Sequence, residues 1–166
     1  MVAVAEPRRE QILAWLEEVK DPEVPVLSIR ELGVLRDVEF IGDDVVVVLT
    51  PTYSGCPAMR AMEDDVLETL RRHGVERVRV STVYAPAWTT DWMSDEAKAK
   101  LEAYGIAPPG RVESDALVPL RRRARVTCPY CRSKNTTLRS EFGSTACKAI
   151  LFCDECRQPF ELFKAI

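Results

Sequence analysis

The sequence predicts an α+β protein in which a small domain with a three-stranded mixed α/β sheet is followed by a C-terminal zinc-ribbon β domain. Two observations lead to this prediction. In the N-terminal part of the chain, apolar residues recur with helical and strand periods in turn. In the last quarter, four cysteines form two CxxC pairs with 21 residues between the pairs. These pairs are Cys128 with Cys131 and Cys153 with Cys156.

Composition divides the chain into two domains. Residues 1–105 are predicted to form the sheet domain, residues 106–120 a linker and residues 121–166 the ribbon. The linker stretch has no periodicity and contains two adjacent prolines and a glycine. A chain of 166 residues is long enough for one domain of usual size and one small domain.

The first predicted elements are a helix and a β-hairpin. The helix ends at Asp21-Pro22, and its buried face comprises Ile12, Trp15, Leu16 and Val19. Residues 35–41 alternate as a half-buried strand, and residues 42–44 turn the chain. Residues 45–49 then return as a fully buried strand.

A second helix and a third strand follow. Pro57 suits the first position of the helix, and His73-Gly74 ends it. The buried stripe of this helix comprises Met59, Met62, Val66 and Leu70. Residues 76–84 alternate as a strand, and the strand–helix–strand order predicts that the second and third strands are parallel.

A short helix precedes the linker. We expect Ser94 to cap it, Leu101 and Tyr104 to be buried, and Gly105 to end it. The longest apolar run, residues 45–49, is too short to cross a bilayer, and the N-terminus has no signal-peptide pattern. We therefore expect a cytoplasmic protein with no membrane partner.

The CxxC pairs predict a metal site. Two such pairs complete the tetrahedron of thiolates that a structural zinc ion prefers. Redox pairs or disulfides are the alternative, which a reducing cytosol disfavours. An iron–sulfur cluster would also accept four thiolates, and the spacing does not separate it from zinc. We interpret Cys147 as a plain buried thiol, with a replacement ligand or a further sulfur for iron as alternatives.

Cys56 is a second candidate site. It follows the second strand in TPTYSGCP and is expected at the N-cap of the second helix, where N–H groups and the helix dipole stabilise a thiolate. Ligand sites in such sheets lie beyond the carboxyl ends of the strands. The alternative is a small buried cysteine behind Pro57. His73 lies 17 residues away at the other end of this helix, so a thiol enzyme would need a histidine from a partner chain.

Two loop segments are expected close to Cys56. Asp21 and Glu23, held between prolines, offer oxygen ligands or hydrogen-bond acceptors, or else form a rigid helix stop with solvated charges. A second segment leaves the third strand at the same edge of the sheet and forms either a lid or a contact surface for a partner. Its contact candidates are Trp88, Asp91 and Trp92.

Charge is distributed unevenly along the chain. Residues 121–166 carry 10 Lys/Arg and 4 Asp/Glu, whereas residues 1–120 carry 13 and 22. The basic run RRRAR at residues 121–125 would suit a nucleic acid. However, the net charge of the chain is −3, and aromatic residues are not interleaved with the basic ones. Nucleic acid is therefore not the expected partner.

Several motifs resemble those of known families. DPEVP, ELGV and TPTYSGCP resemble the small MIP18-type domain of SufT-like iron–sulfur assembly factors. APAWTTDWMS, YGIAPP and FGSTACKA, the last between the two CxxC pairs, are similar to the PaaD family of phenylacetate catabolism. The resemblance covers nearly the whole chain.

The resemblance implies an accessory protein and not an enzyme. Such a protein would assist assembly or delivery of an iron or iron–sulfur centre to the oxygenase or reductase of phenylacetyl-CoA epoxidase, in aerobic aromatic degradation. The implied iron or cluster ligands are Asp21, Glu23, Thr52 and Cys56. Because a cluster usually needs four protein ligands, one cysteine implies a transient site. A second subunit, a small thiol or the client, meaning the protein that receives the metal, would complete it.

The partners implied by this resemblance are the epoxidase subunits or iron–sulfur assembly proteins. A homodimer is left open. The alternative function is a non-catalytic structural subunit that bridges components of the oxygenase through the ribbon and the tryptophan loop.

Overall fold

The computed structural model of the chain describes residues 9–110 and 126–166. The chain divides into two compact units, one that ends at Trp88 and one that begins at Thr89. This division differs from the boundary expected at residue 105, because the third helix groups with the ribbon. The basic run at residues 121–125 and most of the expected linker lie outside the described residues.

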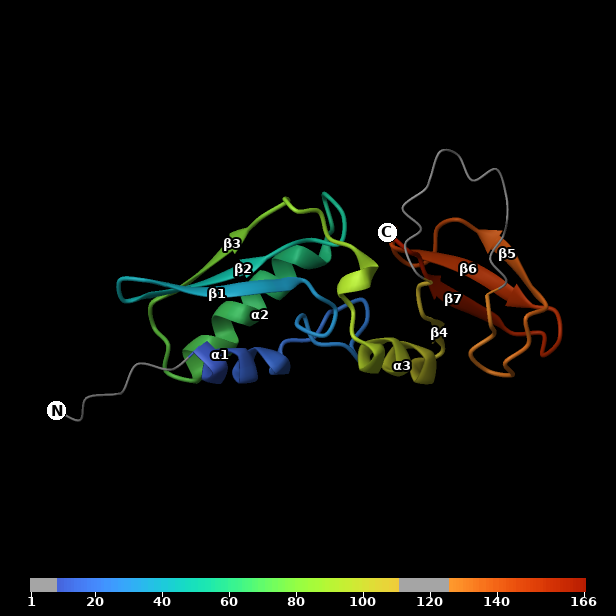
Figure 1. Cartoon of the computed structure of the whole chain (residues 1–166), viewed down its shortest axis with the longest axis horizontal. Helices are drawn as coiled ribbons and strands as arrows, with labels where there is room; N and C mark the ends of the chain where they lie inside the picture. Colours follow the sequence, from blue (N-terminus) through green and yellow to red (C-terminus); the bar gives the residue numbers. More distant parts are fainter. Residues whose placement is uncertain (1–8, 111–125) are drawn as a thin grey trace. The chain divides into compact units, whose positions relative to one another are not determined.

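The first unit contains a three-stranded mixed sheet (Figure 1). Its strands are β1 (Leu35–Ile41), β2 (Asp44–Leu49) and β3 (Val78–Thr82), in the order β1-β2-β3. β1 pairs antiparallel with β2, and β2 pairs parallel with β3, so the predicted topology is confirmed. The helical segments are α1 (Arg9–Trp15), its 3₁₀ continuation η1 (Leu16–Glu18), and α2 (Ala58–Arg72).

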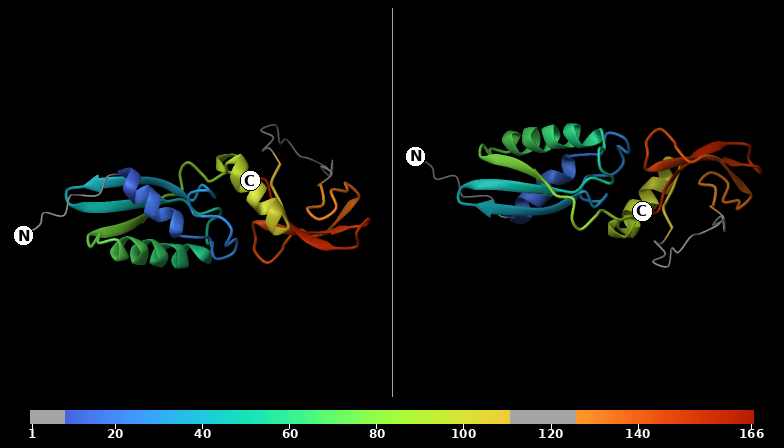
Figure 2. Two further views of the ribbon diagram at one scale, coloured as in Figure 1. Left: turned by 90° about the horizontal axis from the view of Figure 1, so that it is seen from below. Right: turned by 90° about the horizontal axis from the view of Figure 1, so that it is seen from above.

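Both helices pack on the same face of this sheet and against each other (Figure 2). The strand register places Val38, Val47 and Val80 side by side, and Val47 is fully buried. On α2, Met62 and Val66 are also fully buried. Burying one such side chain contributes about 1.5–3 kcal/mol, so this layer forms a stable base for the loops that leave the sheet.

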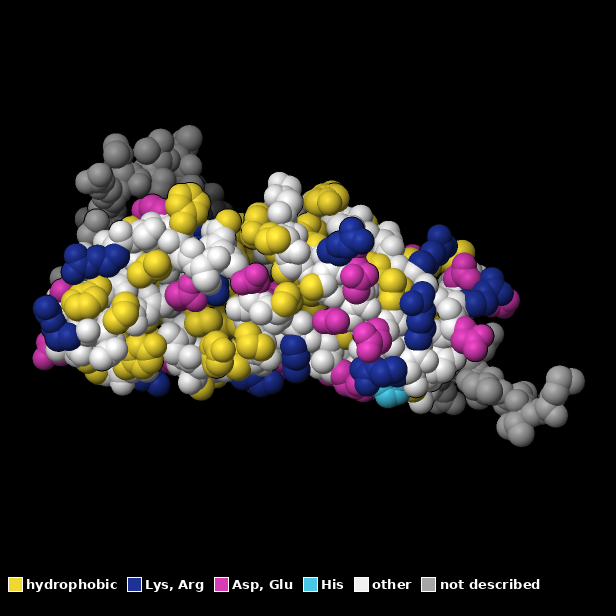
Figure 3. All heavy atoms as spheres, turned by 180° about the vertical axis from the view of Figure 1, so that it is seen from behind, with side chains coloured by type: hydrophobic (Ala, Val, Ile, Leu, Met, Phe, Trp, Pro, Cys, Tyr) yellow, Lys and Arg dark blue, Asp and Glu magenta, His cyan; other side chains and the backbone are white. Residues whose placement is uncertain are grey.

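The surface of the first unit is charged but balanced. On the face shown in Figure 3, Lys and Arg side chains alternate with Asp and Glu side chains over this unit. Exposed ion pairs of this unit join Arg77 to Asp43 and Asp44. Surface pairs of this kind contribute little to stability.

The second unit contains a four-stranded sheet and two helical segments. The strands are β4 (Ile106–Ala107), β5 (Thr136–Ser140), β6 (Lys148–Cys153) and β7 (Pro159–Phe163), in the order β4-β7-β6-β5. The helical segments are η2 (Thr90–Trp92) and α3 (Asp95–Tyr104). The expected linker therefore begins with a strand: Ile106 and Ala107 are buried and pair parallel with β7.

The caps of α3 agree with those predicted from the sequence. The Ser94 hydroxyl accepts the N–H of Ala97 at 3.1 Å, and Gly105 ends the helix with φ of 93°. Leu101 is fully buried, as predicted. The prediction that Tyr104 is buried is wrong, because the chain turns away at Gly105 and leaves 54% of this residue exposed.

The buried stripe of α2 is also shifted slightly from the prediction. Met59 is only half-buried, because the stripe is centred on Ala58, Met62 and Val66. Within residues 9–110 and 126–166, no helix has both the length and the apolar character needed to span a membrane.

Candidate functional site

The candidate site of the first unit is built from three loops at the carboxyl ends of β2 and β3. Backbone hydrogen bonds join these loops: Thr50 N–H donates to Val34 O at 2.8 Å, and Val83 N–H donates to Leu49 O at 2.9 Å. The indole N–H of Trp88 donates to Leu32 O at 3.0 Å. The segments that follow α1, β2 and β3 in the sequence are therefore held together.

Asp21 organises the first of these loops. This residue is only 5% exposed, and its Oδ1 accepts the N–H groups of Glu23 at 2.7 Å and Val24 at 2.8 Å. Its own N–H donates to Leu27 O at 3.0 Å. The expected helix stop is thus a closed turn around a buried carboxylate, whereas Glu23 itself is exposed.

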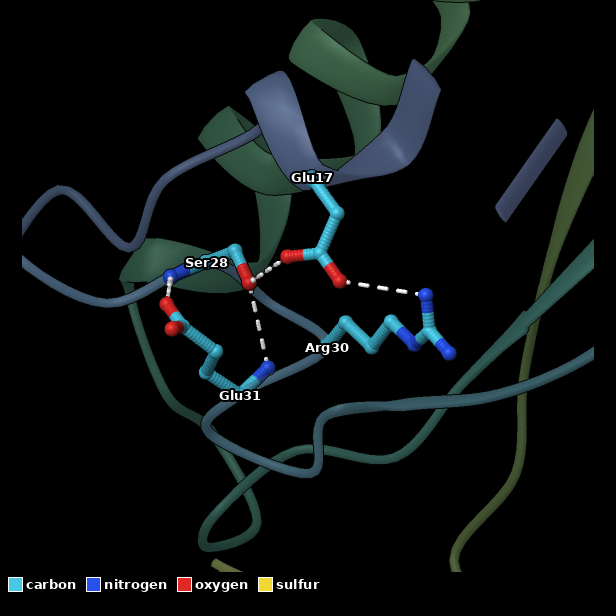
Figure 4. A network of polar contacts seen from close by, with 4 residues as sticks. All are labelled: Glu17, Ser28, Arg30 and Glu31. Atoms are coloured by element: carbon cyan, nitrogen blue, oxygen red, sulfur yellow. Dashed lines mark hydrogen bonds and ion pairs between the residues drawn. The ribbon is translucent and has the colours of Figure 1, made fainter. Parts of the chain in front are cut away.

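A second turn in this loop is fixed by a reciprocal cap (Figure 4). The Ser28 hydroxyl accepts the N–H of Glu31 at 3.1 Å, and the Glu31 carboxylate accepts the N–H of Ser28 at 2.9 Å. Ser28 also donates to Glu17 Oε2 at 2.7 Å, and Arg30 donates to Glu17 Oε1 at 3.1 Å. This network was not predicted from the sequence, although the Ser-x-x-Glu spacing is the signature of a capping box.

Cys56 lies one residue before the position that the sequence predicts. Pro57 is the N-cap of α2, and Cys56 precedes it. The Cys56 carbonyl accepts the N–H of Met59 at 3.3 Å, so the residue joins the first turn of the helix through its backbone. Cys56 is half-buried and forms no disulfide, so it is not sealed within the core.

Polar residues of the same strand end are buried close to Cys56 in the sequence. Thr52 is 8% exposed and Thr50 is 1% exposed. In the part of the chain that the structure describes, the Thr50 hydroxyl oxygen is a buried side-chain oxygen without a hydrogen-bond partner. An unsatisfied buried hydroxyl costs about 1–3 kcal/mol. Thr52 was a candidate from the sequence, whereas Thr50 was not.

The tryptophan segment separates into a buried and an accessible part. Trp88 is 4% exposed and fixes the first loop through its indole N–H, so the structure contradicts its selection as a partner-contact residue. Asp91 is exposed and Trp92 is half-buried in η2 of the second unit. Contact with a partner remains a prediction for these two residues.

His73 is engaged at the far end of α2, where it is the C-cap. Its Nε2 lies 2.7 Å from Glu18 Oε1, and its ring stacks on Trp15 with centroids 4.5 Å apart. The hydrogen bond with His73 lowers the pKa of Glu18. The expected capping role thus agrees with the structure, and these contacts explain the position of His73 without a role in catalysis.

The second candidate site is the four-cysteine cluster of the second unit. The Sγ atoms of Cys128, Cys131, Cys153 and Cys156 all lie within 4.8 Å of one another. The Sγ distances are 3.7 Å from Cys128 to Cys156 and 3.5 Å from Cys131 to Cys153. A disulfide requires about 2.05 Å, whereas tetrahedral zinc with Zn–S bonds of about 2.3 Å places its sulfurs about 3.8 Å apart. The cluster therefore has the dimensions of a zinc site.

The two CxxC turns have the same backbone geometry. Arg132 N–H donates to Cys128 O and Arg157 N–H donates to Cys153 O, both at 3.0 Å. Arg132 and Arg157 both adopt positive φ, at 65° and 62°. Two equivalent turns facing each other present four sulfurs to one ion.

The electrostatics of the cluster favour a cation. Backbone N–H donation, mainly from Cys156, lowers the pKa of the Cys153 thiol to about 7. Burial, together with the neighbouring thiols, raises the pKa of Cys156 to about 12. A divalent ion, when bound, would supply the positive charge that keeps all four groups as thiolates at neutral pH.

Cys147 lies in the same unit outside this cluster. It is 7% exposed, and its Sγ lies 3.0 Å from the Thr145 hydroxyl oxygen. This geometry agrees with its interpretation as a plain buried thiol.

Comparisons with known proteins match each unit to a described family. Residues 9–83 match the family "Iron-sulfur cluster assembly protein", and residues 113–164 match the "PaaD zinc beta ribbon domain". The chain is 45% identical over 166 residues to an Escherichia coli protein named as one subunit of a "Putative 1,2-phenylacetyl-CoA epoxidase", covering 100% of this chain and 98% of that relative.

Shorter relatives match the N-terminal part. "Fe-S protein maturation auxiliary factor YitW" of Bacillus subtilis is 37% identical over 98 residues, which is 58% of this chain and 95% of the relative. The crystal structure of a domain of unknown function, DUF59, from Bacillus anthracis aligns with a TM-score of 0.53 at 32% identity. This alignment covers 56% of the present chain and 90% of the Bacillus anthracis chain.

Proposed function

The chain belongs to the PaaD family, and we propose that it is an accessory protein that assists the maturation of an iron or iron–sulfur centre in the phenylacetyl-CoA epoxidase system. Its full-length relative is named as a subunit of this epoxidase, and its shorter relatives are named as Fe-S maturation auxiliary factors. The names of the shorter relatives describe auxiliary proteins and support a role outside the chemical reaction of the oxygenase.

The observation that carries this proposal is the placement of Cys56. A half-buried thiol stands at the entry to α2, in the loop that joins it to the carboxyl end of β2. Thiolates bind iron in clusters, and carboxylate and hydroxyl oxygens complete iron sites in proteins. Asp21, Glu23 and Thr52 are the oxygen ligands that we propose beside Cys56, and the buried Thr50 hydroxyl adds a further polar group at this strand end.

The proposed site holds iron or a cluster only in transit. One thiolate supplies a quarter of the protein ligands that a cluster usually needs. Ligands from the client or from a small thiol would complete the coordination. Ligands of the client that bind the metal more tightly than Cys56 does would then remove it from the chain. The metal is cargo in this mechanism, and Cys56 is the group that carries it.

The four-cysteine cluster has a different role in this proposal. We assign it a structural zinc ion, supported by its sulfur geometry and by the match to a zinc ribbon. The zinc ion would hold the two CxxC turns together and take no part in iron transfer.

Client activation tests the proposed function. Purified epoxidase components depleted of iron would be reconstituted with iron, sulfide and either the wild-type chain or Cys56→Ala. We expect Cys56→Ala to lower the rate of activation at least tenfold. Cys147→Ala serves as the matched control, because it removes a thiol from the other unit and should leave the rate unchanged. Full activation by Cys56→Ala would contradict the proposal.

A second function is supported by the accessible residues of η2. Asp91 is exposed and Trp92 is half-buried, so both are available to a partner. A structural subunit that bridges oxygenase components would lose complex formation on Trp92→Ala and keep it on Cys56→Ala. The activation assay separates the two functions, because Cys56→Ala lowers activation in the accessory role and leaves it unchanged in the bridging role. Size-exclusion chromatography of the mixed components reports the complex that Trp92→Ala would break.

A further inference from the structure

Two arginines share one aromatic ring on the ribbon. The guanidinium carbon of Arg139 lies 5.0 Å from the centroid of Phe152, and that of Arg157 lies 5.2 Å from the same centroid. Both arginines are exposed and the ring is half-buried. The two positive charges are therefore no more than about 10 Å apart, which is roughly one Debye length in 0.1 M salt.

The fold brings these three residues together from separate elements. Thr137 on β5 pairs with Phe152 on β6, and Arg139 follows two residues later, where the register of β5 shifts. Arg157 comes from the second CxxC turn, between β6 and β7, where its φ is 62°. The grouping of Arg139, Phe152 and Arg157 thus depends on the ribbon sheet and on the second CxxC turn. A short peptide segment could not form it.

Neither arginine is neutralised by an acidic group in the described part of the chain. Between described residues of the second unit, ion pairs join Arg132 to Glu102 and Lys148 to Glu161. Asp154, two residues after Phe152 in the sequence, accepts a hydrogen bond from the Thr137 hydroxyl at 2.7 Å through its Oδ2. Arg132 occupies the equivalent position of the other CxxC turn and has a carboxylate partner, whereas no carboxylate within residues 9–110 and 126–166 pairs with Arg157.

We propose that Arg139, Phe152 and Arg157 form a docking site for an acidic segment of the client protein, recognised through Asp or Glu side chains. Contact with the ring restricts the guanidinium groups, and a planar guanidinium binds a carboxylate through two parallel hydrogen bonds. Restricting these groups before binding lowers the entropy lost when the acidic segment binds. This inference rests on the proposed function only in naming a client.

A protein segment fits this cluster better than a nucleic acid does. Guanidinium groups already lie over the ring, so a base cannot stack freely on it. Two arginines would neutralise only a few phosphates of a nucleic acid. In the sequence no aromatic residue is interleaved with the basic ones. In the folded ribbon Phe152 lies between Arg139 and Arg157, and the two guanidinium groups cover its ring.

Peptide titration of the full-length, zinc-loaded chain tests this docking site. The probe is a synthetic peptide of eight glutamates, and the signals followed by NMR are the Arg side-chain Nε–H groups. We expect the signals of Arg139 and Arg157 to shift, and the double variant Arg139→Gln/Arg157→Gln to bind at least tenfold more weakly. Arg132→Gln is the matched control and should bind as the wild type does.

Three outcomes would overturn the inference. One is equal affinity of the double variant and the wild type for the peptide. Another is tighter binding of a single-stranded oligonucleotide of equal charge, which would make the site a nucleic-acid contact. Binding of the peptide that persists unchanged in 1 M salt would likewise contradict a carboxylate contact.

Client activation separates this inference from the proposed function. The double variant should raise the chain concentration needed for half-maximal activation and leave the maximal rate unchanged, because docking is weakened and the metal carrier is intact. Cys56→Ala should lower the maximal rate, so that no concentration of this variant restores activation. If the double variant shows an unchanged concentration dependence while Cys56→Ala is inactive, the docking site fails and the carrier function stands.

Discussion

At the scale of single residues, we assign Asp21 two roles, one structural and one as a metal ligand. Its buried carboxylate closes a turn by accepting two backbone N–H groups, and we propose it as an oxygen ligand for iron. An amide side chain can accept the same N–H groups but carries no charge. The two roles can therefore be separated by substitution.

We expect Asp21→Asn to keep the turn and to weaken iron binding. Asp21→Ala should also lose the turn, at a cost of about 1–2 kcal/mol in the free energy of unfolding. Hydrogen exchange of the Glu23 and Val24 amides reports the turn, and anaerobic Fe(II) titration reports the metal. An unchanged iron affinity in Asp21→Asn would remove Asp21 from the ligand set.

At the scale of elements, the ribbon contains a partly buried ion pair between neighbouring strands. Lys148 on β6 is 3% exposed, and its Nζ lies 3.0 Å from Glu161 Oε2 on β7. Burial raises the pKa of Glu161, but hydrogen bonds from Ser144 and Lys148 outweigh this effect, and the pKa lies below its usual value. The charged carboxylate therefore stabilises the folded ribbon.

We expect Glu161→Gln to destabilise the ribbon by about 2–3 kcal/mol near neutral pH, because Lys148 stays buried without its counter-charge. The pKa of Glu161 is lowered by folding, so its contribution is present above the ordinary pKa and is lost as the pH falls through the folded-state pKa. The difference between variant and wild type should thus shrink in acid. Denaturant unfolding of the zinc-loaded chain measures it.

Glu141→Gln provides the control for this prediction. Glu141 is exposed, and the hydrogen bond that involves it uses its backbone carbonyl, which accepts from Lys164. A loss of stability as large as that of Glu161→Gln would show that the effect comes from net charge and not from the partly buried pair.

Much of the element order could be predicted, because short-range patterns determine it. The strand expected at residues 35–41 has the bounds of β1, and the Ser94 and Gly105 caps of α3 are confirmed. The exposure of Tyr104 could not be predicted, since it depends on the path of the chain after the helix. The grouping of α3 with the ribbon depends on the pairing of β4 with β7, a long-range contact that periodicity does not contain.

The candidate sites were predictable to different degrees. The spacing of the two CxxC pairs predicts that their four sulfurs lie together, because tetrahedral metal coordination requires that spacing. The network around Ser28 and the orphaned Thr50 hydroxyl were missed, because burial of a polar group depends on tertiary packing. Trp88 was assigned to a contact surface, but its ring is buried and its N–H bonds the first loop.

At the scale of the whole molecule, the two units should respond differently to loss of metal. The ribbon has a small apolar core, and two of its six buried members are the metal-site residues Cys128 and Cys153. Removing the ion would leave the thiols of Cys128 and Cys153 in that core without their metal bonds. Small metal-bound domains of this size often unfold without their ion.

We expect a strong zinc chelator to unfold the ribbon and to leave the first unit folded. Limited proteolysis after complete zinc removal should cleave residues 126–166 rapidly and spare residues 9–83. Restored protection on addition of zinc is the control. Unchanged protection of the ribbon in the metal-free chain would show that zinc has no structural role.

We propose that Cys56 carries iron while the four-cysteine cluster holds zinc. Anaerobic reconstitution with Fe(II) and sulfide, followed by absorption spectroscopy and metal analysis, tests it most directly. We predict one zinc per chain in wild type, Cys56→Ala and Cys147→Ala, and an iron-dependent visible absorption that only Cys56→Ala lacks. Visible absorption of equal strength in Cys56→Ala would contradict the claim.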